Sequence, residues 1–409
     1  MAAQPDTGSG SGERAAGCVG LTEASERALG RTGLTGASEQ AAGRVGLKGS
    51  GTSTEGAAVG AAQRYAWLEN LLPPVEEVRP GLWSIPVPWP GSGLRYTLAY
   101  LVSARTGLAL IDTGWPTEQA WTALCDSITQ TGHDVTDLKY MLVTHAHSDH
   151  LGLAARVREA SGALVGMHPA ERATLRRSEP QEPQVGRVHL SDWLRSRGAP
   201  EDQADQVAAM MTGAVRVHKE LARPDVDIEH GSLPLGASTA LRAVWTPGHT
   251  PGHLCFYDER QDVLLTGDHV LPRITPHIGL PPGSEGDPLG DYQASLRALA
   301  RYNPAEVLPA HEYRFADLGA RLETLLRHHR TRLAEIEHAV AADPGLSTWD
   351  VSAVLTWSRG WDQTLGGARQ SAVSETWAHL LHLQNHQRVI NQGRDRDSWV
   401  PGPRCSAAD

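Results

Sequence analysis

Cysteine is scarce in this 409-residue chain, and the few cysteines follow no pattern. The four residues show neither the paired spacing of a cysteine zinc site nor that of a redox-active dithiol; they are Cys18, Cys125, Cys255 and Cys405. This spacing argues against a disulfide scaffold and against thiol chemistry. We therefore expect all four thiols to be reduced and inert.

Signals for transport into or across a membrane are also missing. The first residues, Met1–Asp6, carry no basic segment, and no apolar stretch follows them, which argues against a secretory signal. Nothing in the sequence indicates a membrane-spanning helix. With 40% hydrophobic residues and a formal net charge of -10, the composition fits an enzyme with one large core and a smaller attachment. We expect a cytoplasmic protein.

Large apolar residues are rare in the first sixty positions. Gly, Ala, Ser, Thr and Glu dominate residues 1–60, so we predict that this segment is disordered. Three copies of a 13-residue repeat lie within it, at Glu13–Leu21, Glu26–Leu34 and Glu39–Leu47. Each copy holds about one large apolar residue, too few to stack as a solenoid. We interpret the segment as a low-complexity tail, or as the result of a start codon assigned too far upstream.

The most informative feature that is present is a dense group of metal-binding side chains. An apolar run that predicts a buried strand leads into Thr-His-Ala-His-Ser-Asp-His, residues 144–150. His145 and His147 alternate along an extended segment, so both imidazoles point to the same side and can share one cation. Asp149 and His150 begin a helical pattern that turns them beside the first pair. Two adjacent metal ions therefore fit this segment.

Three later segments end in further ligand-type residues. His249 lies in a turn whose glycines and prolines favour a rigid loop, and it is the third imidazole for the first metal. Asp268 ends an apolar run, and its carboxylate has two oxygens with which to bridge two cations. His311 ends another apolar run and joins Asp149 and His150 at the second metal.

Together these motifs resemble those of the metallo-beta-lactamase-fold hydrolase superfamily, in both order and residue type. The resemblance covers roughly residues 76 to 315, and includes Leu-Ile-Asp-Thr-Gly at 110–114. In that family a strand-end aspartate, here Asp112, supports the metal ligands from behind. The resemblance implies catalytic roles for Asp112, Asp149 and Asp268. It also implies one metal on His145, His147 and His249, a second on Asp149, His150 and His311, and Asp268 between them.

The ligand set also indicates the metal and the reaction. Nitrogen and oxygen ligands without a nearby cysteine suit zinc, and also manganese or iron, so we expect two zinc ions. A hydroxide that bridges two cations attacks an electrophilic carbonyl or phosphoryl centre. The metals can also stabilise the developing oxyanion, so the enzyme needs no nucleophilic serine or cysteine. We find no convincing catalytic triad in the sequence.

Three further histidines lie near the predicted ligands. His253 follows His249 by four residues and is interpreted as a residue that orients a ligand. His269 and His277 come soon after Asp268. Either could touch substrate, but we favour ordinary loop histidines.

The expected fold is an α/β sandwich of the αββα type, spanning residues 61–315. Strands are predicted around residues 82–87, 96–102 and 108–111, and a helix over 117–131. A helical insertion at about 169–234 could form a lid, with Trp193, Met210 and Met211 lining a substrate pocket. Such residues at helical spacing more often pack a core.

Residues 316–409 predict three helices, over Asp317–His338, Ser347–Trp357 and Ala372–Gln387. The last of them, with the sequence Glu375–Val389, resembles the winged-helix-like C-terminal segment of some family members, certain endoribonucleases among them. However, this region mixes acidic residues with arginine and has no lysine, whereas phosphate binding requires clustered positive charge. We expect this segment to pack against the catalytic domain, and we do not expect a nucleic-acid partner.

Three functions are consistent with the sequence. The leading hypothesis is hydrolysis of a small carboxylic thioester, ester or lactone, because His311-Glu312-Tyr313 resembles the last ligand motif of glyoxalase II, with Ala310 in place of the usual glycine. The second is a phosphodiesterase or ribonuclease. The third is a regulatory nucleic-acid-binding protein with a vestigial metal domain. The expected partner is thus a small acyl substrate, and the sequence does not indicate an oligomeric state.

Overall fold

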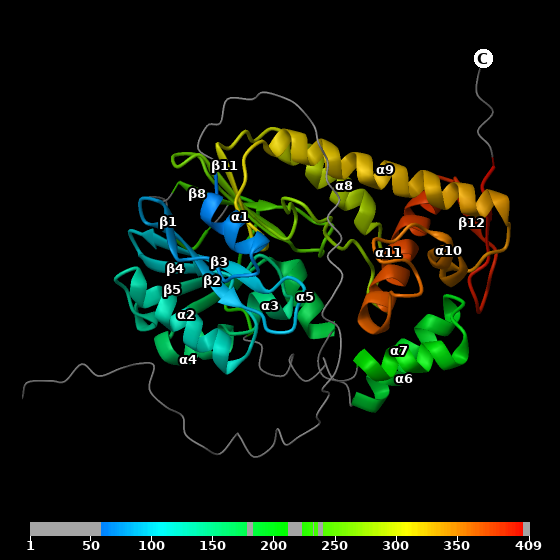
Figure 1. Cartoon of the computed structure of the whole chain (residues 1–409), viewed down its shortest axis with the longest axis horizontal. Helices are drawn as coiled ribbons and strands as arrows, with labels where there is room; N and C mark the ends of the chain where they lie inside the picture. Colours follow the sequence, from blue (N-terminus) through cyan, green and yellow to red (C-terminus); the bar gives the residue numbers. More distant parts are fainter. Residues whose placement is uncertain (1–58, 178–182, 212–222, 232, 236–239, 404–409) are drawn as a thin grey trace, which may run out of the picture. The chain divides into compact units, whose positions relative to one another are not determined.

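Two β-sheets lie at the centre of the protein in the computed structural model, which describes residues 59–177, 183–211, 223–231, 233–235 and 240–403 (Figure 1). In the described chain the larger sheet follows sequence order: β1 (Glu76–Arg79), β2 (Leu82–Pro88), β3 (Tyr96–Ala104), β4 (Gly107–Ile111), β5 (Leu138–Leu142), β6 (Leu164–Met167) and β7 (Val226–Asp227). The smaller sheet has the order β11 (Glu306–Pro309), β10 (Val263–Gly267), β9 (Leu254–Asp258) and β8 (Leu241–Trp245).

Strand direction changes within each sheet. Strands β1 to β4 pair antiparallel, whereas β4 to β7 pair parallel. In the smaller sheet β10 and β11 are parallel, and the other pairs are antiparallel. The strands predicted around residues 82–87, 96–102 and 108–111 correspond to β2, β3 and β4.

Both faces of the larger sheet are buried, which explains the apolar runs along its strands. In β3, Leu98 and Tyr100 face the smaller sheet, while Ala99 and Leu101 face the helices. All four side chains are at most 2% exposed. One strand thus contributes to two cores, and the space between the sheets is filled mainly by apolar side chains.

Helices cover the two outer faces and complete the predicted αββα order. Helices α2 (Glu118–Gln130) and α4 (Ala154–Ser161) pack on the larger sheet, and α8 (Pro288–Leu299) and the start of α9 (Leu318–Ala342) pack on the smaller one. Helix α2 matches the predicted helix, and Thr117 caps it by accepting from the Ala120 amide. Three shorter helices complete this part: α1 (Ala61–Leu68), α3 (Ser148–Leu151) and α5 (Pro169–Arg177).

The region predicted as an insertion contains two kinds of structure. Helix α5 and strand β7 belong to the sandwich, since β7 pairs with β6. Helices α6 (Pro183–Ser196) and α7 (Glu201–Met211) instead share a core with the C-terminal segment. Trp193 packs edge to face on Trp377, with ring centroids 5.7 Å apart, whereas Met210 is 54% exposed. Trp193 is therefore a core residue, the second of its two interpretations. The side chain of Met211 lies outside the described residues.

The C-terminal segment contains α10 (Thr348–Val354) and α11 (Gly366–Asn385), followed by a hairpin of β12 (Val389–Asn391) and β13 (Trp399–Pro401). The three predicted helices are present as α9, α10 and α11, whereas the hairpin was not predicted. Helix α9 joins this segment to the sandwich, because Leu322 packs on the smaller sheet while Val340 lies in the C-terminal core. Figure 1 shows α9 extending from one to the other. None of the described helices, α9 included, is long and apolar enough to cross a membrane.

Cys255 lies on β9 and is fully buried. Burial raises the pKa of its thiol to about 12, so the thiol stays protonated and inert. Cys18 and Cys405, like the predicted tail repeats, lie outside the described residues.

Candidate metal centre

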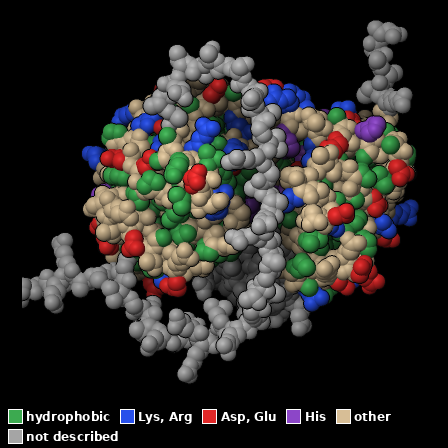
Figure 2. All heavy atoms as spheres, viewed as in Figure 1, with side chains coloured by type: hydrophobic (Ala, Val, Ile, Leu, Met, Phe, Trp, Pro, Cys, Tyr) green, Lys and Arg blue, Asp and Glu red, His purple; other side chains and the backbone are tan. Residues whose placement is uncertain are grey.

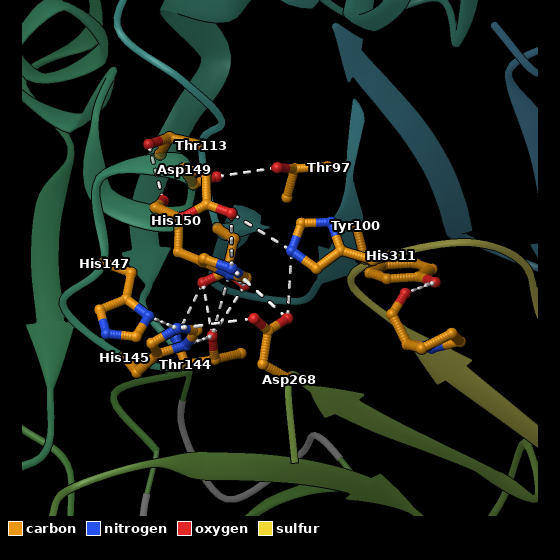
Figure 3. Close-up of polar contacts among 12 residues, drawn as sticks. Thr97, Tyr100, Thr113, Thr144, His145, His147, Asp149, His150, Asp268 and His311 are labelled. Carbon is orange, nitrogen blue, oxygen red and sulfur yellow. Dashed lines mark hydrogen bonds and ion pairs between the residues drawn. The ribbon is translucent and has the colours of Figure 1, made fainter. Parts of the chain in front are cut away.

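All seven predicted ligands meet at one edge of the two sheets. The loop after β5 carries His145 and His147, and α3 carries the next two ligands. Asp268 directly follows β10, and His311 lies just beyond β11, so the parallel pairing of these strands brings both side chains to the same edge. His249 comes from the turn between β8 and β9. Figure 3 shows how the side chains from the larger and smaller sheets point toward each other.

The first group consists of three imidazole nitrogens that face a common point. His145 Nε2 lies 2.9 Å from His147 Nδ1, and His249 Nε2 lies 3.3 and 3.2 Å from these two atoms. Burial lowers the pKa of all three rings, that of His147 to about 3. The rings are therefore neutral, with lone pairs available to a cation.

The second group combines one carboxylate with two imidazoles. Asp149 Oδ2 lies 3.2 Å from His311 Nε2 and 3.4 Å from His150 Nε2. Burial alone would lower the pKa of His311, but the nearby carboxylates of Asp268 and Asp149 outweigh it and raise that pKa to about 10. Positive charge is thus strongly favoured here, whether a proton or a metal ion supplies it.

Asp268 lies between the two groups and presents one oxygen to each. Its Oδ1 atom lies 3.2 Å from His311 Nε2, and its Oδ2 atom lies 3.7 Å from His249 Nε2. Among the described residues, His150 Nε2, His311 Nε2 and Asp268 Oδ1 are buried without a well-formed hydrogen bond. Unsatisfied buried polar atoms are costly. Their convergence fits cations that these atoms would bind.

Asp112, expected to support the ligands, lies behind them and accepts hydrogen bonds from Thr144 and His150. Its Oδ1 atom accepts from the Thr144 amide at 2.8 Å, and its Oδ2 atom accepts from His150 Nδ1 at 2.8 Å. This second bond fixes the proton on Nδ1 and leaves His150 Nε2 free to act as a ligand. Asp112 adopts a positive φ of 59°, which aspartate tolerates better than most residues.

Glu171 is a supporting residue that the sequence analysis missed. Its side chain is fully buried, and its two oxygens accept from the amides of Ala146, at 2.9 Å, and Gly252, at 2.8 Å. One carboxylate thereby ties the loop of His145 and His147 to the turn of His249. No local motif marks Glu171, because its partners lie 25 and 81 positions away.

The three additional histidines have different surroundings. His253 Nε2 accepts from the Asp268 amide at 3.3 Å, which agrees with an orienting role. His249 Nδ1 donates to the carbonyl of His277 at 2.8 Å, so His277 supports a predicted ligand through its backbone. His269 is fully buried beside Tyr292, with ring centroids 4.7 Å apart, and does not face solvent.

The predicted glyoxalase-like motif continues away from the centre after His311. Glu312 is buried and accepts from the Arg273 amide at 2.9 Å. It therefore holds a neighbouring loop in place. We therefore assign Glu312 a structural role and not a role as a ligand.

Two tryptophans form an aromatic wall beside the second group. Trp89, directly after β2, stacks on Trp115 with ring centroids 4.8 Å apart and an interplanar angle of 18°. Trp89 also lies 6.3 Å from the His311 ring. Both indoles are partly exposed, so a planar group approaching the metals can contact them. The sequence analysis did not identify this pair.

Comparison with known proteins agrees with this geometry. The family model described as the metallo-beta-lactamase superfamily matches residues 92–311, more than half of the chain. The chain is similar to the lactamase-like protein vrtG of Penicillium aethiopicum, with 26% identity over 66% of this chain and 69% of that protein. It is also similar to the lactamase-like protein adaB of Aspergillus niger, with 28% identity over 65% of each chain.

Solved structures show the same fold. A metallo-beta-lactamase family protein from Thermus thermophilus has 28% identity and a TM-score of 0.65, with 79% of this chain and 99% of that chain covered. A beta-lactamase domain protein from Burkholderia ambifaria has 23% identity and the same TM-score, with 80% and 95% covered. The second likeness concerns the fold alone.

Proposed function

The chain belongs to the metallo-beta-lactamase superfamily, and on this premise we propose that it is a hydrolase that holds two metal ions, preferably zinc, in the centre described above. The proposed number of two metal ions rests on one observation. Asp268 directs its two oxygens at two separate ligand groups. A single cation would leave one of these groups unused. Elemental analysis of reconstituted protein should therefore give at least two equivalents.

The seven ligands of the centre would be divided between the two ions. His145, His147 and His249 would hold one ion, and the remaining ligands the other, with Asp268 shared. Bound cations would supply Lewis acidity and would make a bound water a nucleophile near neutral pH. Asp112 and Glu171 keep the ligand loops fixed, so the ligands need not reorganise during turnover.

We propose a small carboxylic thioester, ester or lactone as substrate. Several arginines of the C-terminal segment have acidic partners that offset their charge: Arg332 with Glu335, Arg388 with Glu337, and Arg396 with Asp350. Figure 2 shows acidic and basic side chains interspersed on the face it presents. A nucleic acid requires clustered positive charge. The partly exposed Trp89–Trp115 wall instead suits an acyl group with a planar or apolar part.

A phosphodiesterase is the second candidate, and the same aromatic wall gives it some support. Nucleobases also stack on tryptophan, with a contribution of about 1–3 kcal/mol per base. The C-terminal segment also favours this candidate, because its last helix resembles a segment found in certain endoribonucleases. We rank the phosphodiesterase second because arginines of the C-terminal segment are paired with acidic residues. Stacking without phosphate contacts would bind single strands only weakly.

A substrate panel tests the proposal directly. Zinc-reconstituted protein is assayed on acyl thioesters, lactones, a bis-aryl phosphodiester and single-stranded RNA, with Asp268→Ala as the inactive control. We expect turnover of at least one carboxylic substrate class that is lost in the control. Efficient cleavage of RNA with no thioesterase, esterase or lactonase activity would overturn the carboxylic assignment.

A further inference from the structure

A third cluster of metal-binding side chains lies outside the centre. His382 and His386 are four residues apart at the end of α11, so they project from the same face of the helix. Their ring centroids are 4.4 Å apart. Asp287, which caps the start of α8, lies against His382. One ligand atom from each of the three lies within 4.8 Å of the others.

The hydrogen bonds of the two rings leave the right nitrogens available. His382 Nδ1 donates to Asp287, at 2.8 Å from Oδ2 and 3.0 Å from Oδ1. His386 Nδ1 donates to the backbone carbonyl of His382 at 2.8 Å. Since the partners are acceptors, both protons lie on Nδ1, and both Nε2 atoms carry lone pairs. Histidines that bind metals are oriented in this way, with the other ring nitrogen bonded to a carboxylate or a carbonyl.

We propose that His382 and His386 form an additional, solvent-accessible site for a divalent transition metal such as zinc, with Asp287 holding His382 in place. Imidazole ligands favour zinc, nickel or copper over magnesium and calcium. His386 is exposed, so water completes the coordination. The site does not depend on the proposed hydrolysis, because none of its residues belongs to the centre.

An ion at this site would reinforce the bond between His382 and Asp287, which links two parts of the fold. Asp287 begins α8, which packs on the smaller sheet, whereas the histidines end α11 in the C-terminal segment. Binding to the folded protein alone stabilises it by mass action. Metal at this site should therefore raise the midpoint of thermal unfolding and strengthen the contact between α8 and α11.

The test uses protein whose centre is already loaded with zinc. Zinc is titrated into wild type, His386→Ala and a matched control, His338→Ala, which removes an exposed histidine of α9. We expect wild type and the control to bind one further equivalent and to gain thermal stability, and His386→Ala to lose both. His386→Ala leaves the bond between Asp287 and His382 intact. If that bond were only structural, zinc uptake and the gain in thermal stability would be the same in His386→Ala as in wild type. Equal zinc uptake by wild type and His386→Ala would overturn the site.

Two further variants separate this site from the centre. Asp287→Asn preserves the cap of α8 but weakens the hold on His382, and should reduce affinity for the further equivalent. Asp268→Ala should disturb the centre while it retains the further equivalent. If Asp268→Ala alone changes zinc binding, the proposed function stands and the additional site fails.

Discussion

Replacement of Glu171 by glutamine tests how far the metal centre depends on residues that bind no metal. The wild-type carboxylate accepts from two buried backbone amides, those of Ala146 and Gly252. Glutamine keeps one oxygen but turns an NH2 group toward the other amide, so one buried N–H loses its acceptor. That loss costs about 1–3 kcal/mol.

The cost should appear mainly as weaker metal binding. Ala146 lies between His145 and His147, and Gly252 lies in the turn of His249, so the lost bond loosens the loops that carry the first ligand group. A change of 1–3 kcal/mol corresponds to roughly 5–150-fold in affinity. Loss of such supporting contacts typically weakens metal binding about 10–100-fold. The two ranges agree.

Competition with a chromophoric chelator measures the affinity for each equivalent of zinc. Glu159→Gln makes the same chemical change at an exposed position on α4 and serves as control. We expect Glu171→Gln to weaken one equivalent much more than the other, while Glu159→Gln matches wild type. Wild-type affinity for both equivalents in Glu171→Gln would refute the supporting role. An equal loss for both, together with a lower unfolding midpoint of the metal-free protein, would indicate a general defect in folding instead.

Three more predictions address the centre. Asp268→Ala should reduce turnover by orders of magnitude with little change in far-ultraviolet circular dichroism, since both ligand groups lose their shared carboxylate; near-normal turnover would contradict the bridge. In metal-free protein the pKa of His311 is raised to about 10, so its contribution to stability is complete below the unfolded value of about 6.5 and declines as pH rises through about 10. Unfolding midpoints across this range should fall in wild type more than in His311→Gln. Trp89→Ala should raise KM for aryl thioesters more than for acetyl thioesters, and an equal effect on both would exclude the aromatic wall from substrate binding.

The residues that converge in the candidate metal centre could be predicted from the sequence because each belongs to a local motif. His145 to His150 form a compact motif, and His249, Asp268 and His311 each follow an apolar run or a turn. Strands buried on both faces, such as β3, likewise give continuous apolar runs. Glu171 belongs to no local sequence motif, and no motif indicates the contact of Trp89 with Trp115. These pairings exist only once the sheet order brings distant segments together.

The partners of the helices were harder to predict than the helices themselves. Periodicity over 317–338 predicts a helix, but it does not show that the two ends of α9 pack in different cores. The same limit applies to Trp193, for which the sequence favoured a core position over a pocket position but did not identify Trp377 as its partner. Helix α11 also begins earlier than predicted, at Gly366; its first turn contains glycines of low helix propensity, but Gly366 and Arg369 are buried there.

Substrate preference must arise outside the seven ligands. A metal-activated hydroxide would suit carbonyl and phosphoryl centres alike, so bound metals would fix where hydrolysis occurs but not what is hydrolysed. Trp193 packs against Trp377 in the C-terminal core and leaves the lid hypothesis without its principal side chain. The loops after β2 and β4 remain, since they bring Trp89 and Trp115 to the His311 side of the centre. Specificity should therefore change with these two loops while the metal affinity stays the same.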